Sequence, residues 1–212
     1  MRPLLKGMSR GLHSPHRKIG GGVMKNIILC GIGGQGTILA SKLIATAAMN
    51  KGIPVMSAET IGMAQRGGSV FSHLRMGEGI SSPMIKKGQA DMIIGFEPGE
   101  TVRMMPYLKK GGTVITSSRA VMPITSSVTG GGYSGNEMLD YLKSCDCSLT
   151  VADTETACAA LGNYRIVNVL LLGCAVRTGE LGLTADDIKE AIRTRLKEKL
   201  WDLNFRALDY AF

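Results

Sequence analysis

The sequence predicts a single α/β domain in which a mostly parallel sheet is flanked by helices and followed by a helical C-terminal portion. Short apolar runs such as 27–29 and 92–94 are typical of strands that are buried on both faces of a parallel sheet. Between such runs lie stretches of helical length whose apolar residues recur every three or four positions. After residue 152, helical stretches follow one another without another strand candidate. The 212 residues suffice for one such domain with a sizeable core.

Local patterns place the elements in order. The first strand ends in glycines, and the helix after it closes on Lys51 and Gly52, a cation followed by a typical C-terminal glycine. Pro54 is acceptable in the second strand because it lies at the start of that strand. We expect strands at 25–30, 53–58, 70–76, 90–96, 112–116 and 147–152, and helices at 37–51, 101–109, 135–145, 154–161, 165–177 and 184–199.

Two of these elements carry additional signals. The third strand alternates between an apolar side and a wetter side that holds His73, which we interpret as a hydrogen-bonded strand histidine. The last helix opens with Thr184 and Asp187 at the spacing of a capping box. The very apolar stretch 165–173 is compatible with a core helix or with one face of a subunit contact.

The positive charge is concentrated at the N-terminus. The chain has a net charge of +8, and residues 1–23 contribute +5 without any acidic residue, which leaves +3 for residues 24–212. This distribution, with only 5% aromatic residues, excludes a basic nucleic-acid binder. With 44% hydrophobic and 20% charged residues, the body is not a disordered chain.

Residues 1–23 are expected to be a basic, disordered leader before a domain at 24–212. Their composition fits an organelle transit peptide, a phosphate-binding arm or an upstream start, and we favour the last because Met24 opens the first strand. The five cysteines form no C-x-x-C pair, and Cys145 and Cys147 alone cannot hold a cluster. We therefore expect a reduced, cytoplasmic protein without a metal site of its own, and no apolar stretch is long enough to span a bilayer.

The most informative stretch is the turn between the first strand and the first helix. It has the spacing G-x-G-x-x-G, which in this context is typical of a Rossmann-like phosphate-binding turn. Glycines let the backbone approach a ligand, and the first N–H groups of the helix face a phosphate at the positive end of the helix dipole. The alternative is that the glycines only permit close packing. The candidate binding residues are Gly31, Gly33, Gly34, Gln35 and Gly36.

A second candidate loop follows the second strand, where a dinucleotide-binding fold would place a helix. The loop holds Arg66, whose planar guanidinium suits phosphate and carboxylate groups, beside two glycines that can form an anion-binding nest. The alternative is a structural turn with an exposed arginine. The candidate binding residues here are Gln65, Arg66, Gly67, Gly68 and Ser69.

Three acidic residues lie where strands end. Glu59 occupies about the position of the ribose-binding acid of dinucleotide folds. Glu97 and Glu100 follow the fourth strand, at the edge where open α/β sheets bind ligands. They are candidates to face the site, although acids at a helix start also complement the helix dipole. No catalytic residue can be named.

Four stretches together resemble the gamma-type subunit of 2-oxoacid:ferredoxin oxidoreductases. They are the glycine turn at 31–36, the segment 65–70 with Arg75, the strand 90–94 and the segment 163–168. The likeness runs from about residue 24 to the C-terminus and is closest in appearance to the beta subunit of indolepyruvate oxidoreductases.

The resemblance implies a subunit of a multisubunit enzyme that converts a 2-oxo acid to acyl-CoA and CO2 and reduces ferredoxin. It implies that thiamine diphosphate, Mg and [4Fe-4S] clusters belong to a larger partner subunit, and that this chain helps to form a cofactor or coenzyme A cleft. Two alternatives remain open. One is a free-standing NAD(P)- or FAD-binding oxidoreductase, and the other is a nucleotide-binding regulatory protein.

Overall fold

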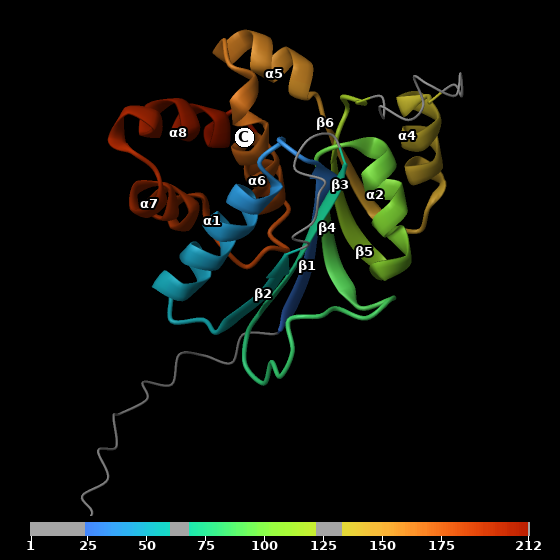
Figure 1. Ribbon diagram of the computed structural model, residues 1–212, viewed down its shortest axis with the longest axis horizontal. Helices are drawn as coiled ribbons and strands as arrows, with labels where there is room; N and C mark the ends of the chain where they lie inside the picture. Colours follow the sequence, from blue (N-terminus) through green and yellow to red (C-terminus); the bar gives the residue numbers. More distant parts are fainter. Residues whose placement is uncertain (1–23, 60–67, 122–132, 212) are drawn as a thin grey trace, which may run out of the picture.

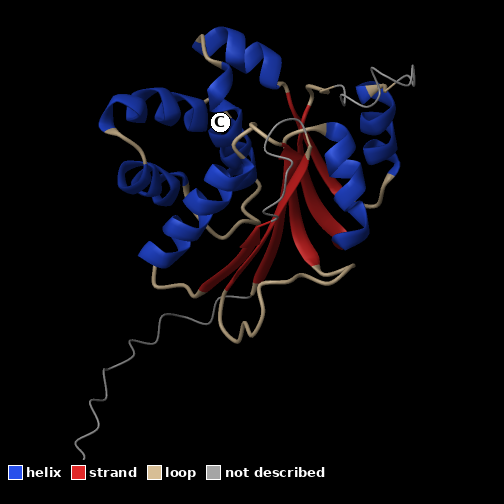
Figure 2. Ribbon diagram, in the orientation of Figure 1, coloured by secondary structure: helices blue, strands red, loops and turns tan. Residues whose placement is uncertain are grey.

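The computed structural model describes residues 24–59, 68–121 and 133–211. Its centre is a six-stranded sheet with the strand order β2-β3-β1-β4-β5-β6 (Figures 1 and 2). The strands are β1 (Lys25–Ile32), β2 (Val55–Glu59), β3 (Ser69–Met76), β4 (Ala90–Gly95), β5 (Leu108–Ser117) and β6 (Ser148–Ala152). Gln65, Arg66 and Gly67 lie outside the described residues, as does the leader at 1–23.

The sheet is mostly parallel, as predicted. β1 pairs parallel with β4, β4 with β5, and β5 with β6. β3 is antiparallel to both of its neighbours, β1 and β2. The carboxyl ends of all strands except β3 therefore meet at one edge of the sheet.

Helices form a layer on each face of the sheet (Figures 1 and 2). On one face, α2 packs against β1, β4 and β5, and α4 packs against α2. On the other face α1, α6, α7 and α8 pack against one another and against the strands. The helices are α1 (Thr37–Asn50), α2 (Pro98–Met104), α4 (Gly135–Ser144), α5 (Thr154–Leu161), α6 (Val167–Arg177), α7 (Ala185–Arg195) and α8 (Trp201–Asp209), with short 3-10 helices η2 (Met105–Tyr107), η3 (Tyr164–Ile166) and η4 (Glu198–Leu200).

The two faces have cores of unequal size. The larger core lies between the sheet and the layer of α1, α6, α7 and α8, and it buries side chains such as Leu43, Ile94 and Leu171 completely. The smaller core, on the α2 face, is built around Ile28, Ile93 and a few neighbours. Consequently one face of the sheet is covered more thoroughly than the other.

The apolar stretch 165–173 is a core helix rather than a subunit contact. Its second part begins α6, which buries every residue from Asn168 to Val176. Gly173 allows this helix to lie against α8, because a Cβ atom there would come within 2.4 Å of the Leu208 carbonyl oxygen.

The expectation of one helix over 184–199 was wrong at its C-terminal end. The capping box of Thr184 and Asp187 is present, but α7 ends at Arg195 because Leu196 takes an extended conformation. The Trp201 indole then donates to the Leu196 carbonyl oxygen at 3.0 Å, and α8 begins. Within the described part of the chain, no helix combines the length and apolarity that crossing a bilayer requires.

Candidate functional site

The glycine turn connects β1 to α1 at the carboxyl edge of the sheet. Gln35 holds the turn in place with both ends of its amide: its Oε1 accepts from the Ile32 N–H at 2.7 Å, and its Nε2 donates to the Phe96 carbonyl at 3.1 Å. The Gly33 N–H donates to the Gly68 carbonyl at 2.9 Å. The turn therefore lies between the end of β4 and the start of β3. The Gln35 amide links the end of β1 to the residue that follows β4.

Two glycines of the turn are required by close contacts. A Cβ atom at Gly31 would lie 2.6 Å from the Gln35 Oε1 and 2.7 Å from the Phe96 Cβ. Gly36 has a positive φ of 85°, and a Cβ atom there would lie 2.9 Å from the Asn168 Nδ2. Gly34 also has a positive φ, of 101°, but its missing side chain faces open space. Close packing thus explains Gly31 and Gly36, whereas Gly34 is accessible to a ligand.

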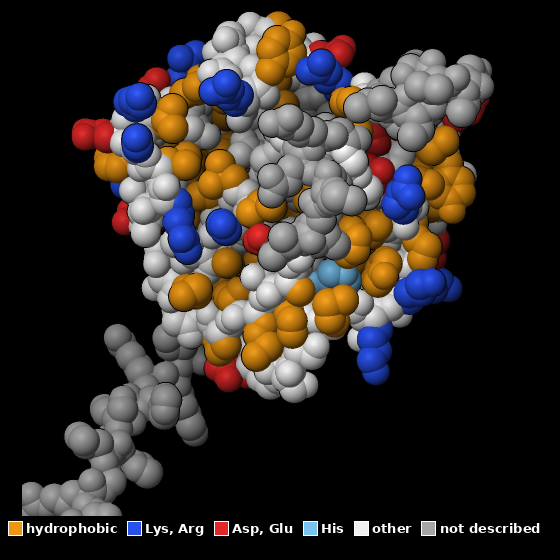
Figure 3. All heavy atoms as spheres, in the orientation of Figure 1, with side chains coloured by type: hydrophobic (Ala, Val, Ile, Leu, Met, Phe, Trp, Pro, Cys, Tyr) orange, Lys and Arg blue, Asp and Glu red, His pale blue; other side chains and the backbone are white. Residues whose placement is uncertain are grey.

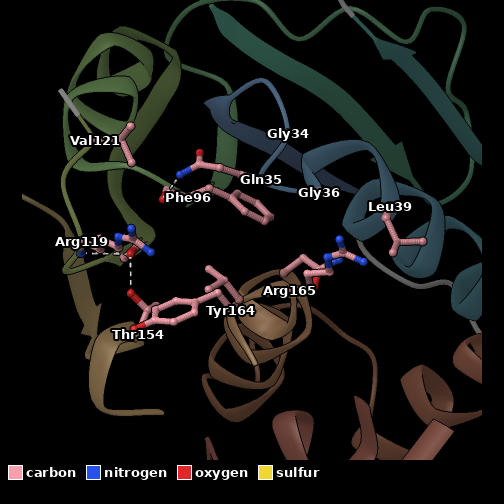
Figure 4. Close-up of a pocket in the computed structure, with 13 residues that line it drawn as sticks. Gly34, Gln35, Gly36, Leu39, Phe96, Arg119, Val121, Thr154, Tyr164 and Arg165 are labelled. Carbon is pink, nitrogen blue, oxygen red and sulfur yellow. Dashed lines mark hydrogen bonds between the residues drawn. The ribbon is translucent and has the colours of Figure 1, made fainter. Parts of the chain in front are cut away.

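A cleft of about 500 Å³ lies between the glycine turn and the segment that leads into α6 (Figure 4). On the other side of the turn is a second hollow of about 320 Å³, which reaches Thr37 and Val70. The turn is therefore a wall between two cavities. The larger cleft is lined by Gly34, Gln35, Gly36, Leu39, Phe96, Ser117, Arg119, Val121, Thr154, Tyr164, Arg165, Val167 and Asn168.

Two arginines give this cleft a positive character. Figure 4 shows Arg119 and Arg165 on either side of Tyr164. The Arg119 guanidinium lies 5.2 Å from the centre of the Tyr164 ring and 3.9 Å from a Glu155 carboxylate oxygen. The Arg165 guanidinium makes no ion pair with any residue that the structure describes. With the N-terminus of α1 on the opposite wall, the cleft is suited to an anionic ligand.

The floor of the cleft is fixed by the ends of β5 and β6. The Ser117 and Thr154 hydroxyls are 2.7 Å apart, and the Arg119 N–H donates to the Ser117 oxygen at 3.0 Å. These bonds orient the backbone that carries Arg119. Arg119, Thr154 and Tyr164 were not among the predicted binding residues. Tyr164 lies in the segment 163–168 that carries the family resemblance, whereas no motif marks Arg119 or Thr154.

The second candidate loop is only partly described. Gly68 accepts the hydrogen bond from Gly33, so this loop does meet the glycine turn. Ser69 begins β3, and its hydroxyl donates to a Glu100 carboxylate oxygen. Ser69 therefore contributes to the support of the site.

Glu97 and Glu100 are buried beside the glycine turn and join several loops. Glu97 caps α2 by accepting from the Glu100 N–H at 2.9 Å, and it also accepts from the Tyr133 hydroxyl. Burial and the neighbouring Glu97 raise the pKa of Tyr133, which keeps this phenol a hydrogen-bond donor. Both acids thus serve the helix start, and both also lie at the carboxyl edge of the sheet.

His73 is buried on β3, in agreement with its interpretation as a strand histidine, but only one of its nitrogens is bonded. Its Nδ1 accepts from the Ile85 N–H at 3.1 Å, whereas its Nε2 has no partner among the described residues. Desolvation by burial lowers the pKa of this imidazole. His73 therefore stays neutral at physiological pH.

The topology argues against a dinucleotide-binding role of Glu59. In that role the acid ends the strand next to β1, but here the antiparallel strand β3 separates β2 from β1. Adjacent strands are about 4.8 Å apart, so the insertion moves Glu59 one strand further from the glycine turn.

The cysteines do not fit an iron–sulfur cluster. Cys30, Cys158 and Cys174 are buried in the two cores, and burial raises the pKa of the Cys30 thiol. Only Cys145 and Cys147 are partly exposed. Among the described residues, no three His, Cys, Asp or Glu side chains are grouped so that they could hold a metal ion.

The fold and the turn define a class of protein. Residues 26–212 match the family described as pyruvate ferredoxin/flavodoxin oxidoreductase, and the chain belongs to this family. It is 36% identical over 186 residues to the indolepyruvate oxidoreductase subunit IorB of Pyrococcus horikoshii, which covers 87% of this chain and 92% of that one. It is 25% identical over 184 residues to the common gamma subunit of the pyruvate/ketoisovalerate oxidoreductases of Thermococcus kodakarensis, with coverages of 86% and 92%.

Solved structures share the fold. The gamma subunit of a keto/oxoacid ferredoxin oxidoreductase from Geobacter sulfurreducens superposes with a TM-score of 0.65 at 22% identity, over 89% of this chain and 96% of that one. The 2-oxoglutarate:ferredoxin oxidoreductase from Magnetococcus marinus gives a TM-score of 0.67 at 17% identity, and the match covers 89% of this chain but 30% of that longer chain. The predicted α/β class and the resemblance to gamma-type subunits are confirmed, and so is the class of enzyme subunit, that of the 2-oxoacid:ferredoxin oxidoreductases.

Proposed function

We propose that this chain is the small subunit of an indolepyruvate or arylpyruvate type of 2-oxoacid:ferredoxin oxidoreductase. The complex would decarboxylate a 2-oxo acid, transfer the acyl group to coenzyme A and pass two electrons to ferredoxin. The observation that carries the proposal is the identity of 34–36% to IorB subunits over at least 87% of this chain and 92% of theirs.

We assign the redox and thiamine chemistry to a larger partner subunit. The burial of Cys30, Cys158 and Cys174 leaves this chain without the four thiolates that a [4Fe-4S] cluster requires. When bound in the complex, thiamine diphosphate with Mg supplies the carbanion chemistry and the clusters carry the electrons. The part of this chain is then to bind and orient a substrate.

The larger cleft fits the anionic part of coenzyme A. Arg165 and Arg119 offer guanidinium groups to its phosphates, and Tyr164 offers an exposed ring beside them. The N–H groups in the first turn of α1 add further donors, because such groups have no partner within the helix. Arg66 and its glycines remain a predicted second contact on the loop after β2.

Co-expression tests the proposal. The isolated chain should be colourless and should not reduce a viologen dye from any 2-oxo acid, even with thiamine diphosphate, Mg and coenzyme A. Together with the larger subunit from the same organism it should form a brown complex that reduces the dye with an arylpyruvate in a coenzyme A-dependent reaction. Turnover by the isolated chain would refute the proposal and favour a free-standing oxidoreductase.

A further inference from the structure

On the α2 face, the helix packing of the described residues does not extend to β2 and β3. On that face α2 packs against β1, β4 and β5. Among the described residues, β3 is contacted there by the connection 77–89 and by Tyr107 of η2. Because side chains alternate along a strand, Met56 and Ala58 of β2 share this face with His73 and Arg75 of β3, their partners in register. We call this region the β3 face.

The β3 face is apolar at its centre. Three rings form a row in which the centroids of Phe71 and His73, and those of His73 and Tyr107, are each 5.6 Å apart. Phe71 and Tyr107 pack against the small core, and both are partly buried. Met56 and Met84 extend from it with exposed fractions of 39% and 55%. Figure 3 shows hydrophobic side chains gathered over this part of the molecule.

The border of the β3 face is basic. Lys86 and Lys87 follow the buried Ile85, Arg103 precedes the buried Met104, and Lys110 lies two residues after Leu108; all four cations are exposed. Glu78 is the exposed acid of the connection 77–89, so the cations outnumber it. In Figure 3 Lys and Arg side chains line the right-hand border of the hydrophobic group. Lys86, Lys87 and Lys110 make no ion pair with a described residue.

Charge separates the possible occupants of this face. A second copy of the chain in a symmetric dimer would bring two basic borders together, which is unfavourable. The leader at 1–23 has a charge of +5 and no acidic residue, so it would be repelled as well. A different protein with an apolar centre and acidic side chains at its border fits both features.

We propose that the β3 face is the docking surface for the larger subunit, which binds it through an apolar centre bordered by acidic residues. The inference rests on the proposed function, from which it takes the partner. Methionine and aromatic side chains suit such a contact because they give large, adaptable apolar area. Met56 and Tyr107 lie where β2 and β5 begin, whereas the larger cleft lies at the carboxyl edge of the sheet.

Single substitutions on the exposed methionines test the centre of the face. Met84→Glu and Met56→Glu should each weaken binding of the purified chain to the larger subunit by about tenfold or more, because a carboxylate would be buried without a partner. The matched control is Met49→Glu, at a 61% exposed methionine on α1 on the other side of the sheet; it should change the Kd less than about twofold. Circular dichroism and Tm of each variant establish that it is folded.

Charge reversal tests the border. Lys86→Glu with Lys87→Glu should weaken binding and reduce its dependence on salt, whereas Lys197→Glu with Lys199→Glu, at exposed lysines between α7 and α8, should do neither. If the folded methionine variants and their control bind the larger subunit equally well, the docking surface is wrong although the proposed function stands. If the wild-type chain does not bind the larger subunit at all, the proposed function itself fails.

Two further outcomes would overturn the proposal. One is a dimer of the isolated chain that Met84→Glu converts to a monomer while binding of the larger subunit is unchanged. The other is a β3 face that binds an apolar dye only after residues 1–23 are removed.

Discussion

Single residues in the larger cleft divide into those that hold the structure together and those that remain available. The Gln35 amide is hydrogen-bonded to the backbone of Ile32 and Phe96. The Asn168 Oδ1 accepts from the Val169 N–H at 3.0 Å, and its amide lies against Gly36. Arg165 has its backbone N–H bonded to Asn163, but its guanidinium is directed to the cleft (Figure 4). Arg165 is therefore the residue on which ligand binding should depend most.

Arg165→Ala should raise the KM for coenzyme A in the assembled enzyme. Losing a charge-assisted hydrogen bond costs about 1.5–3 kcal/mol, which corresponds to roughly 10- to 150-fold. Arg165→Lys should restore only part of the affinity because an ammonium cannot bind two oxygens in a fork. Steady-state kinetics with saturating 2-oxo acid measure the effect, and an unchanged KM in an intact complex would remove Arg165 from the site.

Arg66, on the loop after β2 and outside the described residues, is a second predicted contact for coenzyme A. If the Arg66 guanidinium holds an anionic group, Arg66→Ala should weaken the apparent affinity for coenzyme A. The expected loss of binding free energy is again about 1.5–3 kcal/mol. The same kinetic assay decides. Coenzyme A dependence equal to that of the wild type would reduce the loop after β2 to a structural turn.

His73 should make the fold sensitive to acid. Its pKa is lowered in the folded state by burial, so below about pH 6.5 the unfolded chain binds a proton that the folded chain resists. The free energy of unfolding should therefore fall as the pH drops below that value, by at most about 1.4 kcal/mol per pH unit from this group. Denaturant unfolding of the isolated chain from pH 7.5 to 5 measures it. His73→Gln, which keeps an acceptor for the Ile85 N–H, should flatten the profile; an equally steep profile in that variant would assign the effect elsewhere.

Among the elements, the turn between β1 and α1 combines two demands on one glycine. Gly36→Ala should lower the free energy of unfolding for two reasons. A side chain in the left-handed conformation costs about 1–2 kcal/mol, and the contact of the new Cβ atom with the Asn168 amide costs about 1–3 kcal/mol more. Gly162→Ala is the matched control, because Gly162 also has a positive φ, of 68°, with nothing within 4 Å of a Cβ atom. Equal losses of unfolding free energy in both variants would show that α6 does not press on the turn.

The helices show which elements a sequence can and cannot predict. The capping box of Thr184 and Asp187 was predictable because both of its hydrogen bonds are local. The break between α7 and α8 was not, because no glycine or proline marks it. After α7, Leu196 is extended and packs against the larger core, and its carbonyl oxygen accepts from the Trp201 indole.

The candidate site was predictable only in part, for the same reason. The G-x-G-x-x-G spacing of the glycine turn lies within six residues, so the position of the turn could be predicted from local sequence. Arg119 and Tyr164 come from connections after β5 and α5, and only the parallel sheet brings these to the same edge as the turn. The roles of Gly31 and Gly36 in packing also depend on partners, Phe96 and Asn168, that local sequence does not reveal.

At the scale of the whole molecule, β1 is the first element that the structure describes. β1 begins at Lys25, and its pairing with β3 also begins there, opposite Met76. Deleting residues 1–23 should therefore leave Tm, assembly and activity of the complex unchanged. Thermal unfolding and gel filtration of the truncated chain with its partner measure this, and loss of assembly would show that the leader is structural.

The insertion of β3 between β2 and β1 is the other large-scale feature, and the sequence did not predict it. The alternating pattern of 70–76 identified a strand but not its neighbours. Its antiparallel pairing with both β1 and β2 creates the partly covered β3 face and moves Glu59 away from the glycine turn. This strand order differs from that of a dinucleotide-binding fold, in which the strand that carries the ribose-binding acid lies next to β1.

Hydrogen exchange of the assembled enzyme with and without coenzyme A tests the central claim most directly. The account predicts that coenzyme A slows exchange of backbone amides at 33–39 and 163–168, the two walls of the larger cleft, and at 65–69 if the loop after β2 takes part. The same segments of the isolated chain should change little or not at all. Protection confined to the larger subunit, with these walls unaffected, would contradict the account.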